Sequence, residues 1–154
     1  MSSHEKAVTY TSYLKVDELL ELQQPLSEGP EHDELLFITI HQVYELWFQQ
    51  MLHELAALQP ALEQGATHRS LALLSRVRTI MKTCVAQIDV LETMTPLQFA
   101  SFRSRLSSAS GFQSAQFREL EAVLGRRDHA GAQAKEGSGM RMAEHLVPGS
   151  PARL

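Results

Sequence analysis

The sequence predicts an all-α protein, and three observations support this fold class. Apolar residues recur every three or four positions along most of the chain up to residue 125, which is the spacing of one helix face. No run alternates between apolar and polar residues for long enough to form a strand. The length of 154 residues fits one domain, and a hydrophobic fraction of 44% is sufficient for a core.

The first two of five expected helices have recognisable ends. The first covers about residues 9–24 and ends before Pro25. The second runs from about Asp33, as N-cap, to Leu58, and Pro60 marks its exit. This second segment is apolar on most of its faces, which predicts a position in the middle of a helical bundle.

The third expected helix carries an apolar seam, and the fourth has residues typical of a helix start. The third covers about residues 68–92. Its apolar residues form a predicted a/d seam for antiparallel packing: Leu74, Val77, Met81, Cys84, Ile88 and Leu91. The fourth begins after Thr95 as N-cap, with Pro96 at the first helical position and Gln98 completing a capping box, and it ends near Leu106.

The fifth expected helix is followed by a change in composition. It runs from about Ser114 to Leu124, and Gly125 is a natural C-terminal stop. The remaining segment, 126–154, contains no Phe, Trp or Tyr, so it lacks the apolar surface needed to offset its ordering entropy. We therefore expect a helical part over 1–125 and a divergent, mostly disordered tail.

Charge, hydropathy and cysteine content exclude several classes of protein. The net charge of −4 gives no electrostatic reason to expect a nucleic-acid partner. No stretch approaches the roughly 20 apolar residues that cross a bilayer. Cys84 is the single cysteine, which excludes an intramolecular disulfide and favours a reducing compartment. The expectation is a cytoplasmic protein that binds neither membrane nor nucleic acid.

His41 is the first candidate for chemistry. It lies inside the most hydrophobic segment, one turn after Phe37 and one turn before Glu45. Apolar surroundings favour the neutral imidazole, in which one ring nitrogen donates and the other accepts. The alternative is a core histidine that bonds a neighbour. His41 and Glu45 would supply only two ligands to a metal, so no metal site is predicted.

Arg103 is the second candidate, one turn after Phe99 on a short helix. Its planar guanidinium suits a carboxylate, and the following Ser110-Gly111 turn could add backbone donors. The alternative is an ordinary surface arginine.

A set of sequence blocks carries more specific information than these single residues. The blocks are Tyr10-Thr-Ser-Tyr13-Leu14, Asp17-Glu-Leu-Leu20 with Leu22-Gln23, His32 to Phe48, His53-Glu54-Leu55, Leu91-Glu92-Thr93-Met94-Thr95-Pro96, Phe102-Arg103, and Ala109 to Ser114 with Gln116-Phe117-Arg118. The most distinctive pieces are HQVYELWF, which begins at His41, and SGFQS, which begins at Ser110. Together they resemble the tryptophan 2,3-dioxygenase family over about residues 9–125, in the order the family has them.

This resemblance implies a fold, a reaction and a cofactor. The fold would be an all-α bundle of the tryptophan/indoleamine 2,3-dioxygenase type. The reaction would be the haem-dependent insertion of O₂ into the indole ring of L-tryptophan, which gives N-formyl-L-kynurenine in the first step of the kynurenine pathway. The cofactor would be haem b, and the assembly a homotetramer.

The resemblance also implies roles for individual residues. The histidine at the His41 position lies on the distal side of the haem and hydrogen-bonds the indole N–H, and the arginine at the Arg103 position pairs with the substrate carboxylate. Phe37 corresponds to a residue packed against indole and haem, and Phe99 to an aromatic residue on the same wall.

Two further segments have implied roles in substrate binding. Tyr10 and Tyr13, which share a helix face, correspond to an N-terminal arm that reaches into the neighbouring subunit's site. Ser110 and Gly111 correspond to a loop that orders over the substrate.

The sequence departs from the family pattern after Gly125. The proximal histidine that binds the haem iron is expected beyond residue 154, and neither His129 nor His145 lies in a segment that resembles its helix. The expectation is therefore a fragment or short form without a metal ligand of its own. An alternative is a non-catalytic helical module that associates with a full-length relative through the a/d seam and the Tyr10–Tyr13 arm. Another is a haem protein that acts on a different indole or aromatic amino acid.

Overall fold

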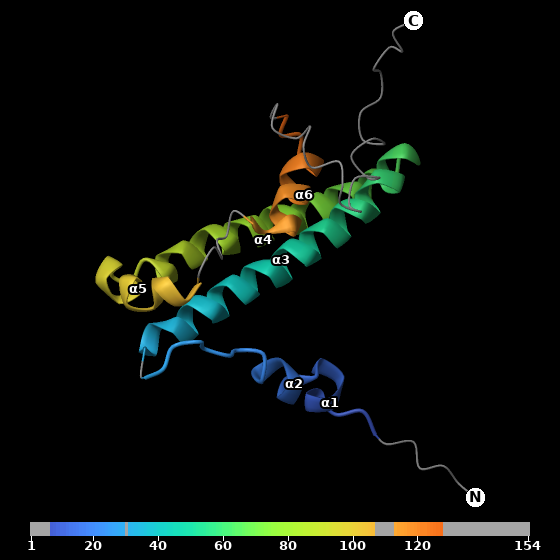
Figure 1. Cartoon of the computed structure of the whole chain (residues 1–154). Coiled ribbons are helices and arrows are strands. Elements are labelled where there is room, and N and C mark those ends of the chain that lie inside the picture. Colours follow the sequence, from blue (N-terminus) through green and yellow to red (C-terminus); the bar gives the residue numbers. More distant parts are fainter. Residues whose placement is uncertain (1–6, 30, 107–112, 128–154) are drawn as a thin grey trace, which may run out of the picture.

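The computed structural model describes residues 7–29, 31–106 and 113–127 (Figure 1). These residues form helices and contain no strand, so the all-α prediction is confirmed. The elements are α1 (Tyr10–Leu14), α2 (Val16–Leu20), α3 (His32–Glu63), α4 (Thr67–Leu91), α5 (Pro96–Arg103), a 3₁₀ turn (Ser104–Leu106) and α6 (Ala115–Val123). None of these helices is long and apolar enough to cross a bilayer.

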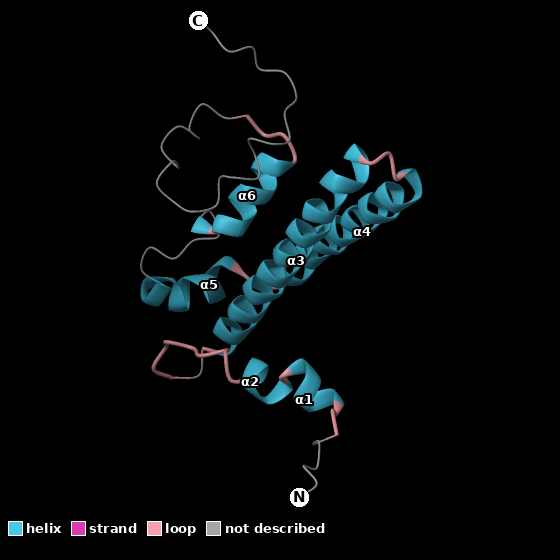
Figure 2. Cartoon of the chain, turned by 90° about the vertical axis from the view of Figure 1, so that its right-hand side faces the viewer, coloured by secondary structure: helices cyan, strands magenta, loops and turns pink. Residues whose placement is uncertain are grey.

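The two long helices, α3 and α4, lie side by side as an antiparallel hairpin (Figures 1 and 2). The chain reverses between them at Gly65, whose φ of +65° suits a residue without a Cβ. α3 also contacts α5 and α6, which confirms its predicted central position. The buried core gathers residues of α3, α4 and α6: Met51, Leu55, Leu58, Val77, Ile80 and Leu120.

The predicted N-cap of α3, Asp33, is wrong. The helix begins at His32 after Glu31, and no side chain caps it. The backbone itself turns the chain into the helix, because the Glu31 N–H donates to the carbonyl of Gly29 and the Glu34 N–H donates to that of Glu31. Asp33 instead lies in the first turn, where its charge favours the positive end of the helix dipole.

The predicted exit of α3 at Pro60 is also wrong. The helix continues through Pro60 to Glu63. Proline removes one backbone donor, but Leu58 and Ala61 on either side are both buried. Their burial holds the last turn in place despite the missing hydrogen bond.

The single helix expected over residues 9–24 is in fact two five-residue helices. Lys15 breaks it, with a left-handed backbone at φ 54° and ψ 44°. α1 starts with a capping box between Thr9 and Ser12, and neither α1 nor α2 contains a buried residue. No buried apolar side chain therefore holds the segment together as one continuous helix.

The a/d seam of α4 is predicted only in part. Val77 is buried and Cys84 packs against the core as expected, but the structure buries Ile80 and leaves Met81 43% exposed. Leu74 and Ile88 are likewise exposed. Adjacent apolar pairs such as Leu73-Leu74 and Ile80-Met81 fit either of two helix faces, so the spacing alone does not select the face that meets α3.

Three further helix boundaries are confirmed, whereas α5 ends at Arg103 and only a 3₁₀ turn continues to the expected end at Leu106. Thr95 caps α5 in a capping box with Gln98, and Ser114 caps α6 by accepting from the Phe117 N–H at 3.1 Å. Gly125 follows α6 with a φ of +98°. Of the predicted tail, residues 128–154 lie outside the described part of the chain.

Candidate functional site

Aromatic rings from α3 and α5 meet where the two helices cross. Phe37 of α3 stands at the centre, with its ring centroid 4.1 Å from that of His41 and 5.7 Å from those of Phe99 and Phe102. Phe102 is completely buried and meets both phenylalanines edge-on. Ring pairs at these separations stabilise their own arrangement, so α5 is fixed against this part of α3.

His41 has a defined donor and acceptor side. Its Nδ1 lies 2.7 Å from the carbonyl oxygen of Phe37, one turn earlier. A carbonyl only accepts, so Nδ1 carries the hydrogen, and Nε2 of the neutral ring is left as an acceptor. This contact agrees with the prediction of a histidine that bonds a neighbour, and it leaves the other ring nitrogen able to accept an N–H.

Arg103 ends the same row of side chains. The central carbon of its guanidinium lies 5.9 Å from the centroid of the Phe99 ring, within the range of a cation–π contact. His41, Phe37, Phe99 and Arg103 thus follow one another in contact. An acceptor at one end, an aromatic wall and a cation at the other end are brought together from two helices.

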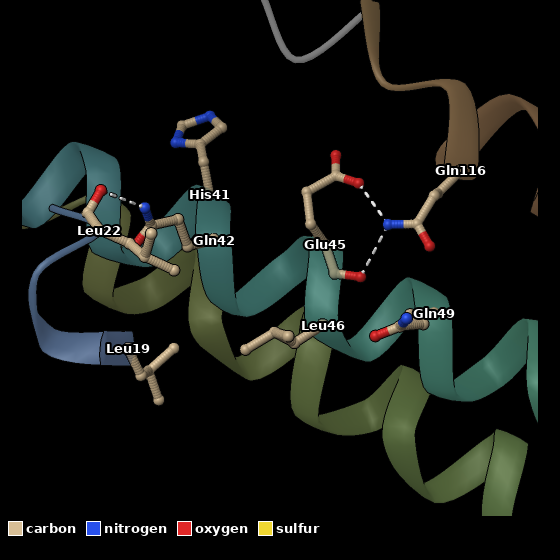
Figure 3. Close-up of a pocket in the computed structure, with 8 residues that line it drawn as sticks. All are labelled: Leu19, Leu22, His41, Gln42, Glu45, Leu46, Gln49 and Gln116. Carbon is tan, nitrogen blue, oxygen red and sulfur yellow. Dashed lines mark hydrogen bonds between the residues drawn. The ribbon is translucent and has the colours of Figure 1, made fainter. Parts of the chain in front are cut away.

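A pocket of about 390 Å³ opens beside His41 (Figure 3). It is lined by Leu19 and Leu22 near α2, by His41, Gln42, Glu45, Leu46 and Gln49 of α3, and by Gln116 of α6. His41 and Glu45 project from the same side of α3, and Gln116 reaches across to Glu45 (Figure 3). The Gln116 amide donates to the Glu45 carboxylate at 2.7 Å and to the Glu45 carbonyl at 3.0 Å.

The segment that leads from α2 to α3 is tied down by two polar side chains of α3. The buried carboxylate of Glu34 accepts from the N–H groups of Leu26 and Ser27 at 2.7 and 3.0 Å. Burial raises the pKa of Glu34, but the hydrogen bonds from Ser27 and Leu26 lower it by more. The pKa therefore lies below its usual value. Gln42 donates to the Leu22 carbonyl at 3.0 Å, which places Leu22 at the pocket.

Other predicted site residues are not part of this cluster. Tyr10 and Tyr13 lie on α1, 77% and 74% exposed, and α1 is well separated from α5 in both views (Figures 1 and 2). Ser110 and Gly111 lie outside the described residues. The described part of the chain contains no group of three or more His, Cys, Asp or Glu side chains that could hold a metal ion.

Sequence reasoning missed two members of the site. Phe102 follows Phe99 by three positions, a helical spacing that places both on one face, so a signal was present. Gln116 gave no such signal, because it meets Glu45 across 71 residues of sequence.

Comparison with known proteins places the sequence in a family. The sequence profile described as tryptophan 2,3-dioxygenase matches residues 1–137. A tryptophan 2,3-dioxygenase of Anaeromyxobacter sp. (strain K) is 59% identical over 150 residues, which is 97% of this chain and 52% of the relative. Those of Anaeromyxobacter dehalogenans and Herpetosiphon aurantiacus are each 66% identical, over 82% and 78% of this chain and 47% and 46% of the relatives. The chain spans about half the length of the curated relatives it matches.

Proposed function

The chain belongs to the tryptophan 2,3-dioxygenase family, and we propose that α3 and α5 supply the substrate-facing side of a site where O₂ is inserted into the indole ring of L-tryptophan. The observation that carries this proposal is the contact row from His41 through Phe37 and Phe99 to Arg103. Its three chemical features match the three parts of the substrate: an N–H, a flat ring and a carboxylate.

In this proposal His41 orients the indole. Because Nδ1 donates to the Phe37 carbonyl, Nε2 accepts the indole N–H in the neutral ring. The hydrogen bond of Nδ1 also fixes the ring plane, so the acceptor points in one direction before substrate arrives. Preorganised groups of this kind lower the cost of ordering on binding.

The aromatic side chains bind the indole ring and exclude water. Phe37 and Phe99 present the wall, and the buried Phe102 supports both from behind. A flat apolar ligand is stabilised on such a surface by offset or edge contacts with the phenyl rings. Arg103, at the end of the wall, pairs with the carboxylate of the amino acid through its planar fork.

Haem b fits this proposal on one side only. Phe37 and His41 would face it on the distal side, where an apolar ring and a neutral imidazole suit a flat macrocycle. The iron would bind and activate O₂. The family resemblance puts the proximal histidine outside this chain, so the iron ligand would come from other residues of a complete site. Tyr10 and Tyr13, exposed on α1, would complete the site of a neighbouring subunit in a homotetramer.

A chimera tests the proposal. In it, this chain replaces the matching half of the Anaeromyxobacter sp. (strain K) relative, and formation of N-formyl-L-kynurenine is measured with haem, L-tryptophan and O₂. We expect product from the chimera. We expect Arg103→Ala to raise the KM for tryptophan roughly 10- to 100-fold, the loss of one charge-assisted hydrogen-bond pair.

Arg69→Ala provides the matched control, because Arg69 is an exposed arginine on α4. The control should leave KM unchanged. A folded chimera that yields no N-formyl-L-kynurenine would contradict the reaction, whereas an unchanged KM in Arg103→Ala would contradict only the role of Arg103.

A second candidate function is association with a full-length relative without catalysis. The observation that favours it is the unburied arm, in which Tyr10, Tyr13 and Leu20 are 68–77% exposed. Co-purification with the Anaeromyxobacter relative, lost in a Tyr10→Ser/Tyr13→Ser double variant, is the expected result. Absence of co-purification of the unmodified chain would remove this candidate.

A further inference from the structure

α4 carries two apolar stripes, and the hairpin uses only one. The inner stripe, Leu73, Val77, Ile80 and Cys84, packs against the core. The outer stripe consists of Leu71, Leu74, Met81, Val85 and Ile88, which are 43–65% exposed. At 3.6 residues per turn the two stripes are rotated by roughly 100° about the helix axis, so they face two different neighbours.

The outer stripe has the spacing of a second packing seam. With Arg78 at the one polar position, its members follow the three-four repeat of a helix that packs along its whole length against another helix. A solvent-facing helix side is normally polar, and a continuous exposed apolar stripe marks a binding surface. In Figure 2, α4 lies at the edge of the described structure, with α3 on its inner side.

The charges on α4 indicate what would cover this stripe. Arg76 forms an ion pair with Glu54 of α3 at 3.0 Å. Arg78, two positions further and in the middle of the outer stripe, makes no ion pair with any described residue, and the same is true of Lys82. A partner helix with a carboxylate opposite Arg78 would therefore gain both apolar burial and an ion pair.

The same charges argue against a second copy of α4. An antiparallel pair centred on the stripe would place the two copies of Arg78 within about one turn of each other, and a parallel pair would place them side by side. Lys82 would add to the repulsion. Like charges at this distance oppose association.

The length of the relatives supplies another source for a partner helix. The chain matches 46–52% of the three relatives described above, so about half of each relative lies outside the match. We propose that the outer stripe of α4 docks an amphipathic helix with an acidic residue opposite Arg78, and that this helix belongs to the part of the family's chain outside the match.

Co-expression of two separate polypeptides tests this docking without using catalysis. One is this chain, and the other is the tagged remainder of the Anaeromyxobacter sp. (strain K) relative. We expect the two to co-elute in affinity purification and size-exclusion chromatography. Leu74→Asp and Val85→Asp should each lower the recovered complex at least tenfold, whereas Leu97→Asp, at an 83% exposed position of α5, should not.

Arg78→Glu keeps the test independent of folding, because it replaces one exposed charged residue with another. It should weaken the complex several-fold at low salt and less at high salt. Failure of the unmodified chain to co-elute, or equal recovery with Leu74→Asp, would overturn the proposal. A homodimer of this chain alone that Leu74→Asp abolishes would overturn it in favour of self-association. These readouts contain no haem or tryptophan, so their failure leaves the proposed reaction untouched.

Discussion

The α3–α4 hairpin and the N-terminal arm, residues 7–29, are both helical, but they are held in place in different ways. The hairpin buries a continuous apolar core between two long helices. The arm consists of two five-residue helices with no buried residue. It is attached to α3 through its backbone, which donates two N–H groups to Glu34 and accepts a hydrogen bond from the Gln42 amide. The hairpin is therefore stabilised mainly by burial, and the arm by a few polar contacts.

This difference separates stability from function in the molecule. Isolated helices of five residues are not stable in water, since helix nucleation is unfavourable. The arm therefore depends on its anchor points, while its apolar residues stay available to another surface. The row of His41, Phe37, Phe99 and Arg103 belongs to the packed part of the molecule and not to the arm, because α5 packs directly on α3. Substitutions in the two regions should consequently give different signatures.

The largest expected effect comes from a charge placed in the hairpin core. Met51 is 1% exposed, and Met51→Asp would bury an unpaired carboxylate, which should lower the free energy of unfolding by more than about 4 kcal/mol. Tyr13→Asp in the arm should change it by less than about 0.5 kcal/mol. Urea unfolding followed by circular dichroism measures both values. Similar losses in the two variants would mean that the arm belongs to the cooperative core.

A smaller effect is expected from the ion pair between α3 and α4. Arg76→Ala leaves the buried carboxylate of Glu54 without its cation and should lower the unfolding free energy by about 2 kcal/mol. This is less than for a fully buried pair, because the Arg76 side chain is 61% exposed. Lys82→Ala, an exposed cation on the same helix, is the control and should have no measurable effect.

The same pair has a pH dependence whose sign is fixed. Burial raises the pKa of Glu54. Hydrogen bonds from Arg76 and Gln50, together with the charge of Arg76, lower it by more, so the pKa lies below its ordinary 4.5. A lowered pKa gives stability above pH 4.5 that is lost as the pH falls through the folded-state value. The difference between the unmodified chain and Arg76→Ala should be largest near neutral pH and should vanish as the pH falls below the folded-state pKa of Glu54. A difference independent of pH would exclude this electrostatic origin.

The comparison of the two regions also explains how much the sequence could predict. Helix ends with a local cause were correct, such as Thr95 with Gln98 and the stop at Gly125. The predicted exit at Pro60 was wrong because burial on either side of Pro60 carries α3 onward. The predicted N-cap at Asp33 was wrong because local backbone hydrogen bonds begin the helix without a side-chain cap. The seam of α4 was half right, because Ile80 and Met81 are both apolar and only α3 determines which one is buried.

In the candidate site, too, local features could be predicted and contacts between distant residues could not. Phe37 and His41, like Phe99 and Arg103, are one helical turn apart, so their shared faces could be predicted. That α5 brings these two pairs together was implied only by the family resemblance. The hydrogen bonds from Gln116 to Glu45 join helices that are far apart in the sequence. No local sequence pattern predicts them.

A moderate and local effect is expected where the arm is anchored. Glu34→Gln replaces one of the two carboxylate oxygens that accept from Leu26 and Ser27. Loss of one charge-assisted hydrogen bond of about 1.5 kcal/mol should speed amide exchange at Leu26 and Ser27 roughly tenfold. Amides in the middle of α4 should keep their exchange rates. Glu28→Gln, at an exposed position of the same segment, is the control, and equal exchange in the two variants would argue against the anchor.

The smallest expected effect lies within the arm itself, at the break between α1 and α2. Lys15 adopts the left-handed region at φ 54°, which costs a residue with a Cβ about 1 kcal/mol relative to glycine. Lys15→Gly should therefore slow amide exchange in α1 and α2 by a few-fold at most, since glycine also gains entropy in the unfolded chain. Lys15→Ala is the matched control, because both variants remove the exposed ion pair with Glu18 but only glycine relieves the backbone. If alanine protects the arm better than glycine, the two short helices join into one, and the break at Lys15 is a property of its side chain and not of the fold.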